Sequence, residues 1–324
     1  DLTNDELLYI IDNDDDLFSK WDTLQKLVRS VILLRAEKKI NKQLENSLLI
    51  SYEKLIEIYG NKNPGFLAAI LKVPSVSELE LYQSSIDPNS LYDAHIFFSS
   101  LIGNSISSSL SKLLSKCYLK SSLIWPKGQG ERKLIKTIWS LLIFGKDIDI
   151  RDQILKAVRG DSMTLSMSAL EALKPIECIE RNTAMEIFYN KWESNPIVLD
   201  TWFGMEASIP RSNSLEIIKS LLTHPRFDPI APNSIRAVLG GFAKNTKSFH
   251  SIDGSGYMFM AKQISSVDKR NAITASRLSK VFSRWSSYVT PNSQKMLRAV
   301  EWLNNQDLTS NTREVIETIL SKVN

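Results

Sequence analysis

The fold is decided by a stretch near the start of the chain, WDTLQKLVRSVILL at residues 21–34. Its apolar side chains recur at intervals of three and four residues, which places them on one face of an α-helix. The same spacing continues through almost every later segment, whereas strict alternation of apolar and polar residues over five or more positions is hard to find. The chain is therefore predicted to be all helix.

The periodicity and the helix start and stop signals also predict where the later helices lie. They are expected at residues 43–59, 64–71, 75–83, 89–119, 132–144, 147–159, 163–172, 179–192, 198–206, 214–222, 234–242, 255–264, 272–288, 293–303 and 311–322. Prolines separate many of these segments, and the connections are short. This organisation predicts an all-α superhelical array of antiparallel helix pairs, HEAT- or armadillo-like, although no repeat of fixed period is visible.

Composition places the chain among ordinary folded proteins of a reducing compartment. It has 324 residues, with 40 basic and 36 acidic side chains and a net charge of +4. Cys117 and Cys178 are too few and too far apart for a disulfide framework or a cysteine zinc site, so a cytoplasmic location is expected. No apolar run approaches the roughly 20 residues that a membrane span needs, so a membrane is not expected as a partner.

The charge is unevenly distributed along the chain. Residues 211–300 hold 14 Lys and Arg against four Asp and Glu, a net charge of +10. Such a segment can attract nucleic acid, an acidic protein or the carboxylate of a ligand. Nucleic-acid binders usually add aromatic or glycine-rich motifs that read bases, and none is found, so nucleic acid is not expected. One alternative remains: a freestanding helical-repeat scaffold that binds an acidic protein partner or nucleic acid through this basic C-terminal third.

The histidine inventory argues against a catalytic or metal site in this chain. The three histidines, His95, His224 and His250, include no pair four residues apart, so the HExxH zinc motif is absent. The sequence DGSG at residues 253–256 resembles a phosphate loop, but no predicted strand precedes it and no lysine follows at the required spacing. We interpret it as a helix cap, with glycines that permit close packing. No catalytic residue and no metal ligand are predicted.

Arg236 is a candidate binding residue. It falls in the first turn of a predicted helix whose expected cap is Asn233, where a cation opposes the helix dipole by roughly 0.3–1 kcal/mol. An acidic group is expected to compensate for it. A guanidinium beside exposed helix N–H groups would suit a carboxylate. A salt bridge to another helix is the alternative interpretation.

Arg277 is a second candidate, because it lies on one stripe of a predicted helix with Ile273, Lys280 and Arg284. A separate stripe of apolar side chains, which includes Phe282, is turned about 120° away by 3.6-residue geometry. One stripe is expected to pack, and the other to face solvent or a cavity.

Short motifs along the chain resemble one known family. They are DLFSKWD at residues 16–22 with Gln25, LKVPSVSE at 71–78, IDP at 86–88, YNKW at 189–192, VLDTWF at 198–203, PNSIR at 232–236, FH at 249–250, DGSGY at 253–257 and ASRL at 275–278. Together they resemble the C-terminal helical domain of aminopeptidase N, in its bacterial and parasite-type branch. The resemblance runs from about residue 2 to the C-terminus.

The resemblance implies a fragment of a zinc metalloaminopeptidase of the gluzincin type, a hydrolase that removes N-terminal residues from peptides. The zinc and the catalytic residues would belong to an upstream domain that is missing from this chain, so no cofactor is expected here. The helical domain would close over that centre, enclose a substrate chamber and gate access to it. Residues 1–16 would be a connector from the missing upstream domain, and residues 17–324 the C-terminal α-helical repeat domain. Its partners would be the catalytic and N-terminal domains of the same polypeptide and peptide substrates.

The resemblance also implies roles for particular residues. Arg236 and Arg277 match basic residues that face the chamber and contact the distal part or the carboxylate of a bound peptide. Ile273 matches a position, often glutamine or methionine in relatives, at the edge of the pocket for the first side chain of the substrate. Lys20 stands where relatives usually carry arginine. The predicted substrate-binding residues are thus Arg236, Arg277 and Ile273, and the isolated chain is expected to be inactive.

Overall fold

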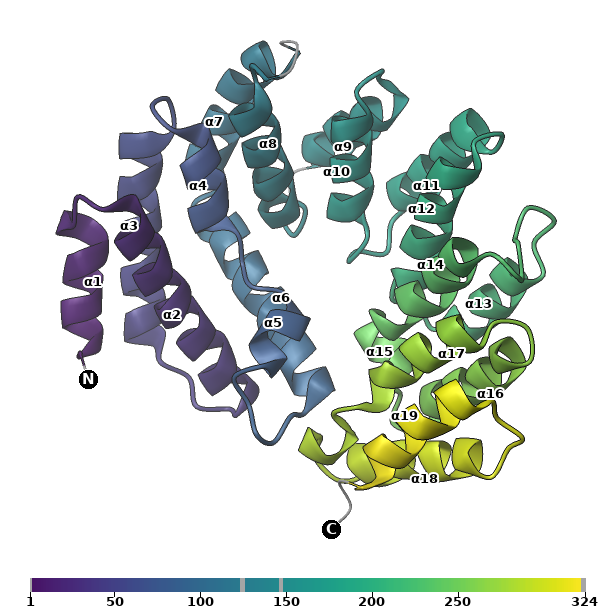
Figure 1. The fold of residues 1–324 in the computed structure, drawn as a ribbon. Helices are drawn as coiled ribbons and strands as arrows, with labels where there is room; N and C mark the ends of the chain where they lie inside the picture. Colours follow the sequence, from purple (N-terminus) through teal and green to yellow (C-terminus); the bar gives the residue numbers. More distant parts are fainter. Residues whose placement is uncertain (1, 123–125, 146–147, 322–324) are drawn as a thin grey trace. The chain divides into compact units, whose positions relative to one another are not determined.

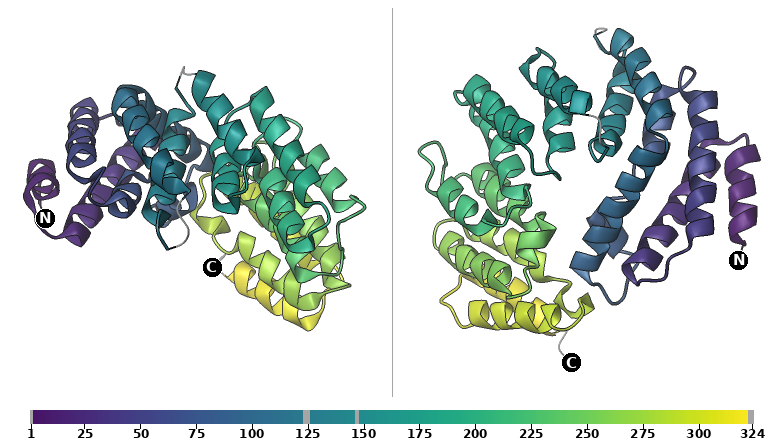
Figure 2. Two further views of the ribbon diagram at one scale, coloured as in Figure 1. Left: turned by 90° about the horizontal axis from the view of Figure 1, so that it is seen from above. Right: turned by 180° about the vertical axis from the view of Figure 1, so that it is seen from behind.

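A computed structural model describes residues 2–122, 126–145 and 148–321, and within these residues the regular elements are α-helices and two short 3-10 helices (Figure 1). No strand occurs among the described residues, apart from a single β-bridge between Ile86 and Tyr288. The all-α prediction is therefore confirmed. Helices run back and forth in antiparallel pairs within each part of the chain, which Figure 2 shows from two further directions.

The chain forms two compact units. Unit 1 comprises residues 1–82 and 90–184, and unit 2 comprises residues 83–89 and 185–324. The helices up to the second boundary are α1 (Asn4–Asn13), α2 (Leu17–Ala36), α3 (Lys42–Tyr59), α4 (Pro64–Leu71), α5 (Val76–Glu80), α6 (Pro88–Ser105), α7 (Ser107–Ser121), α8 (Gln129–Leu142), α9 (Ile148–Arg159) and α10 (Met163–Leu173). Helix α11 (Ile179–Trp192) contains that boundary.

Unit 2 holds the remaining helices. They are α12 (Pro196–Ser208), α13 (Ser214–Leu222), α14 (Pro232–Ala243), α15 (Thr246–Phe249), α16 (Ser255–Asp268), α17 (Ala272–Ser279), η1 (Lys280–Phe282), η2 (Trp285–Ser287), α18 (Asn292–Asn304) and α19 (Ser310–Leu320). Their apolar faces meet in one core, in which Phe203, Phe242, Tyr257 and Phe282 are fully buried. Every helix of this unit thus has one face committed to the core and one left for other contacts.

The acidic segment at the start of the chain is a helix, where a connector was expected. Thr3 and Glu6 form a capping box at the start of α1, and Leu7 and Ile11 are buried. The Nζ atom of Lys20, which is also buried, donates a hydrogen bond of 2.8 Å to the carbonyl of Ile11 and so caps the end of α1. The segment is thus the first helix of unit 1, and its role as a link to an upstream domain stays a prediction.

Two predicted long helices are interrupted. The helix expected at residues 89–119 divides into α6 and α7 at Ile106, whose φ of −115° is not helical. The helix expected at residues 272–288 ends at Ser279 and continues as two 3-10 turns. Within these turns the indole Nε1 of buried Trp285 donates a 3.1 Å hydrogen bond to the carbonyl of Ile319. This tertiary contact outweighs the local helical periodicity.

Helices α12 and α14 lie parallel and very close together. The Ser234 hydroxyl donates a 2.6 Å hydrogen bond to Asp200 near the start of both helices. Further along, a Cβ added at Gly241 would lie 2.6 Å from the carbonyl oxygen of Gly204. Only a residue without a side chain permits this approach, so the two glycines set the distance between the helices.

Helices α17 and α19 continue the same parallel layer. Asn271, the N-cap of α17, donates to the carbonyl of Ile230 immediately before α14. At the start of α19 the N–H and hydroxyl of Thr309 both donate at 2.7 Å to Asp268, which ends α16. Helices α12, α14, α17 and α19 therefore all begin on one side of unit 2, which we call its N-terminal edge.

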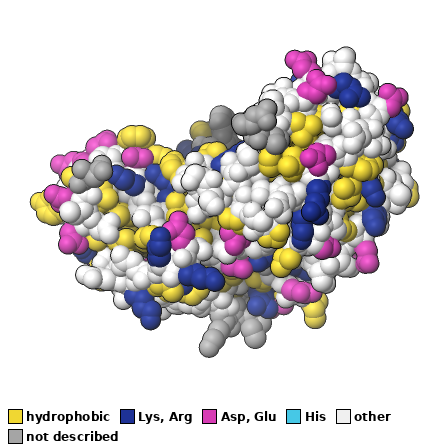
Figure 3. Space-filling view, turned by 90° about the horizontal axis from the view of Figure 1, so that it is seen from below, with side chains coloured by type: hydrophobic (Ala, Val, Ile, Leu, Met, Phe, Trp, Pro, Cys, Tyr) yellow, Lys and Arg dark blue, Asp and Glu magenta, His cyan; other side chains and the backbone are white. Residues whose placement is uncertain are grey.

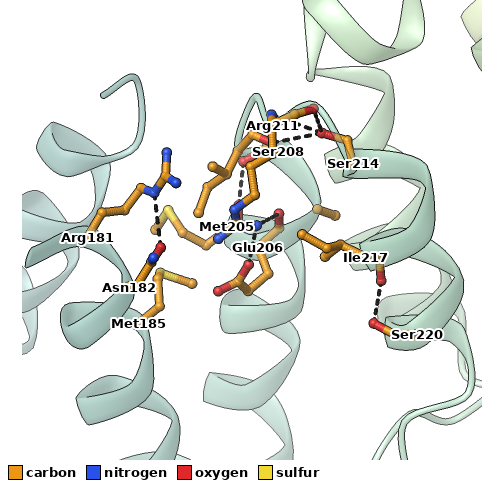
Figure 4. A network of polar contacts seen from close by, with 12 residues as sticks. Arg181, Asn182, Met185, Met205, Glu206, Ser208, Arg211, Ser214, Ile217 and Ser220 are labelled. Atoms are coloured by element: carbon orange, nitrogen blue, oxygen red, sulfur yellow. Dashed lines mark hydrogen bonds and ion pairs between the residues drawn. The ribbon is translucent and has the colours of Figure 1, made fainter. Parts of the chain in front are cut away.

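The corner between α12 and α13 is held by polar contacts that are shielded from solvent (Figure 4). Glu206 and Arg211 form an ion pair of 2.6 Å, and their side chains are only 11% and 13% exposed. Arg211 also donates its backbone N–H to the Ser214 hydroxyl, and buried Asn245 donates to the carbonyl of Ile209 at 2.7 Å. This corner fixes the turn at the opposite end of α12 from the N-terminal edge.

We expect Arg211→Ala to lower the free energy of unfolding by about 3 kcal/mol, because it leaves the shielded Glu206 carboxylate without its partner. Chemical denaturation measures the change. The control is Lys72→Ala, which breaks a pair whose side chains are 61% and 50% exposed and which should change stability by less than about 0.5 kcal/mol. Equal effects of the two substitutions would contradict this account of the corner.

Candidate functional site

Arg236 lies exposed at the N-terminal edge, but its helix begins earlier than expected. Ala231 is the N-cap and Pro232 the first helical residue, so Asn233 is not the cap. The reason is that proline, which has no N–H, fits the first helical position. Arg236 donates at 2.6 Å to the Asn233 side chain and at 3.2 Å to the Pro232 carbonyl. Within the described residues it has no carboxylate partner, so the expected compensating acid is not found.

Ile273 and Arg277 lie one turn apart on the exposed face of α17. The Ile273 side chain is 59% exposed and Arg277 is also exposed. In contrast, Leu278 and Phe282 are buried in the core. The two predicted stripes hold as far as Ser279, where α17 ends, whereas Arg284, predicted on the exposed stripe, is half-buried. No ion pair or hydrogen bond joins the Arg277 guanidinium to the part of the chain that the structure describes. It is therefore available to a ligand.

The structure places the three predicted residues on neighbouring helices that begin side by side. Asn271, two residues before Ile273, donates to Ile230, which lies just before the helix that carries Arg236. Side chains on α-helices lean toward the helix N-terminus, so all three lean toward the N-terminal edge. The first N–H groups of a helix add a partial positive charge at the same place. The arrangement suits a carboxylate with apolar groups near it.

The loop before α14 is ordered by Asp228. Its Oδ1 atom accepts hydrogen bonds from the N–H groups of Ile230 at 2.8 Å and Ala231 at 3.0 Å. These backbone hydrogen bonds hold the pKa of the Asp228 carboxyl below its usual value. Sequence reasoning missed this residue together with Ile230 and Asn271. Asn271 does carry a signal, because asparagine directly before a predicted helix is typical of an N-cap.

The basic residues of the 211–300 segment do not gather on one surface. Exposed members occur on the different helices α13, α14, α16, α17 and α18 of unit 2: Lys219, Arg236, Lys262, Arg277 and Arg298. On the face shown in Figure 3, basic and acidic side chains are interspersed. The charge excess of the segment is therefore distributed around the unit.

His250 is buried and has a structural role. Its Nδ1 atom lies 2.7 Å from the hydroxyl of Tyr257, and that hydroxyl accepts from Asn292 at 2.9 Å. The ring also contacts Phe249 and Tyr288. Tyr257 can then donate to an unprotonated Nδ1, so the site fits a neutral imidazole. Burial lowers the pKa of His250 to about 3.

We expect His250 to make unit 2 sensitive to mild acid. An unfolded chain binds a proton at this histidine below about pH 6.5, whereas the folded chain does not until about pH 3. The stabilising contribution is therefore complete above pH 6.5 and is lost as the pH falls toward 3, by up to about 1.4 kcal/mol per pH unit. Denaturation of the native chain and of His250→Gln between pH 7 and 4 measures the difference. Parallel pH profiles would contradict it.

The other histidines and the DGSG turn also have structural roles. The Nε2 atom of His224 lies 3.3 Å from the Tyr189 hydroxyl, while its Nδ1 accepts from the N–H of Arg226. Burial lowers the pKa of His224 and of His95. Asp253 was expected to cap α16, but Gly254 is the N-cap and makes no side-chain cap hydrogen bond. Asp253 lies one residue earlier and accepts from the N–H of Ser255 at 3.0 Å.

The described residues of this chain do not fit a zinc site. Nowhere in residues 2–122, 126–145 and 148–321 do three His, Cys, Asp or Glu side chains gather so that they could hold a metal ion. The side-chain hydrogen-bond partners of His224 and His250 are the hydroxyls of Tyr189 and Tyr257. Among the helices that the structure describes, none is both long and apolar enough to cross a membrane.

Comparison with known proteins gives the family. Residues 4–321 match a family described as a domain of unknown function (DUF3458_C) with ARM repeats. Aminopeptidase N of Escherichia coli (strain K12) is 29% identical over 293 residues, which are 88% of this chain and 33% of that protein. The chain belongs to the aminopeptidase N family, as its C-terminal helical domain. This confirms the resemblance and the armadillo-like fold class predicted from the sequence.

Other members are similar in extent. Aminopeptidase N of Caulobacter vibrioides is 28% identical over 89% of this chain and 33% of its own length. Aminopeptidase N of Haemophilus influenzae is 26% identical over 99% of this chain and 37% of its own length. A crystal structure of Legionella pneumophila aminopeptidase A in complex with aspartic acid has the same fold, with a TM-score of 0.89, 24% identity, and coverage of 99% of this chain and 39% of that one. This C-terminal domain thus spans about a third of the length of its curated relatives.

Proposed function

We propose that the chain closes over the catalytic domain of a zinc metalloaminopeptidase, helps to enclose its substrate chamber, gates access to it and contacts the distal part of the bound peptide. Family membership supports the enzyme class. The single observation that carries the contact role is the exposure of Arg236, Ile273 and Arg277 at the N-terminal edge. Its partners are then the catalytic and N-terminal domains of one polypeptide, and its ligands are peptides.

The chemistry of the N-terminal edge fits the carboxylate end of a peptide. Guanidinium groups bind carboxylates through charge-assisted and often bidentate hydrogen bonds. Arg277 has no competing carboxylate within the described residues, and Arg236 is bonded only to neutral oxygens. Helix N–H groups favour the same charge. A carboxylate that reaches this edge would thus meet cations that are not already neutralised.

Bond cleavage is assigned to the part of the enzyme outside this chain. In this proposal zinc lies there, where it would polarise the scissile carbonyl and activate water. The residues of this chain hold and orient the peptide and exclude water around it. A cytoplasmic location is proposed with the rest, and it is supported by two cysteines that remain free thiols, Cys117 and Cys178.

We expect Arg277→Ala in the complete enzyme to raise KM for a pentapeptide about tenfold and to change KM for a single-residue aminoacyl reporter less than twofold. The reason is that only the longer substrate has a carboxylate far from the cleaved bond, and tenfold corresponds to one charge-assisted hydrogen bond of about 1.4 kcal/mol. Steady-state kinetics on both substrates tests this. Arg298→Ala, on α18, is the matched control, and equal effects of Arg277→Ala on both substrates would argue against distal contact.

We also expect the isolated chain to bind no stoichiometric zinc and to hydrolyse no aminoacyl reporter, because its described residues offer no metal cluster. Metal analysis after dialysis against zinc, together with an activity assay of pure protein, gives the answer. Activity that persists in pure protein and is lost on chelation would overturn the division of labour proposed here.

A further inference from the structure

Ile230 is an exposed aliphatic residue on a backbone that is held from both sides. Its side chain is 63% exposed. Its N–H donates to Asp228 at 2.8 Å, and its carbonyl accepts from the Asn271 side chain at 3.4 Å. Exposed isoleucines are common on protein surfaces. Because side chains bond both its N–H and its carbonyl, the backbone of Ile230 is fixed while its side chain stays exposed to a ligand.

Asn271 connects Ile230 to the predicted contact residues of α17. Its Oδ1 atom accepts from the N–H of Thr274 at 3.0 Å and caps the helix, while its Nδ2 atom reaches Ile230. Ile273, also largely exposed, follows two residues later. Asn271 thus ties the backbone of Ile230 to the start of the helix that carries Ile273 and Arg277.

The start of α17 is itself fixed from its other side. Asp268 is only 3% exposed and accepts hydrogen bonds from Thr309 and Thr312 at the start of α19. The Thr312 hydroxyl also reaches the carbonyl of Ala272. Asn271 therefore holds Ile230 against a helix that is anchored in the core of unit 2.

We propose that Ile230 is a further substrate-contacting residue, which offers an apolar surface to an aliphatic side chain close to the carboxylate of the bound peptide. This rests on the proposed function, in which Arg236 and Arg277 contact that carboxylate. Asp228 and Asn271 are positioning residues, because they act through the backbone of Ile230. Groups held in place before binding lose little conformational entropy when the peptide arrives, so they contribute to selectivity.

The test uses the complete enzyme and two matched series of tri- to pentapeptides that end in Leu or in Ser. Ile230→Ser is expected to lower the Leu-to-Ser ratio of kcat/KM about fivefold at the length that reaches this surface. The midpoint of thermal unfolding should stay unchanged, because the side chain is exposed. Ile252→Ser is the control, since Ile252 is also exposed, at 79%, and its carbonyl also accepts a side-chain hydrogen bond, from Lys295.

Asn271→Asp tests the positioning role. The substitution keeps the oxygen that caps α17 and removes the N–H donor to Ile230. The Leu-to-Ser ratio of kcat/KM should therefore fall about twofold without loss of stability. Asn41→Asp is its matched control, because Asn41 caps α3 with the same 3.0 Å geometry in unit 1. Comparison of the two Asn→Asp variants thus separates the effect of losing the hydrogen bond to Ile230 from the effect of changing a helix cap.

Arg277→Ala, measured on the same peptides, separates the two levels of the proposal. If it raises KM for the peptides while Ile230→Ser leaves the ratio unchanged, the apolar surface is wrong and the proposed function stands. If neither change affects the peptides, distal contact by this edge is wrong as well. If Ile230→Ser lowers reporter and peptide activity equally together with the unfolding midpoint, Ile230 is a structural contact and this inference is overturned.

Discussion

The N-terminal edge of unit 2 depends on four helices that lie parallel and start together. Apolar burial alone does not fix such an arrangement, because the side-chain ridges repeat along each helix and can interlock in more than one register. The polar contacts at the helix starts remove that freedom. Ser234 joins α14 to Asp200 in α12, and Asn271 joins α17 to Ile230 before α14. The Thr312 hydroxyl joins α19 to the carbonyl of Ala272 in α17. The exposed arginines and isoleucines have defined places because these contacts set the register.

The polar contacts fix the register of the helices, and the close approach of Gly204 and Gly241 fixes the distance between α12 and α14. A larger side chain at Gly241 would meet the carbonyl of the facing residue and push α14 away from α12. Arg236 would move with α14, while Arg277 would stay with α17. The spacing of the two arginines is therefore set by residues that lie far from any ligand.

Much of this fold follows from apolar periodicity, because an amphipathic stripe is a local property. Helices α4, α11 and α13 begin and end where the pattern predicts. The interruptions at Ile106 and after Ser279 could not be predicted, since they arise where a tertiary contact, such as that of Trp285 with Ile319, outweighs local propensity. For the candidate site, the burial stripes predicted the exposure of Arg277 and Ile273, but not that Asn271 would reach a carbonyl 41 residues away. A partner so distant in the sequence is determined by the tertiary fold, so no periodic pattern in the sequence indicates it.

The β-bridge at Ile86 has a consequence for how this domain can be inherited. Ile86 is fully buried, and its N–H and carbonyl are bonded to Ser287 and Val289, while Asn89 binds the carbonyl of His250. Residues 83–89 thus complete a unit whose other residues are 185–324. A gene fragment that encodes only residues 185–324 would lack them. Recombination at a single crossover point near residue 185 would separate residues 83–89 from the helices that they complete, because unit 2 is not encoded by one continuous stretch of gene.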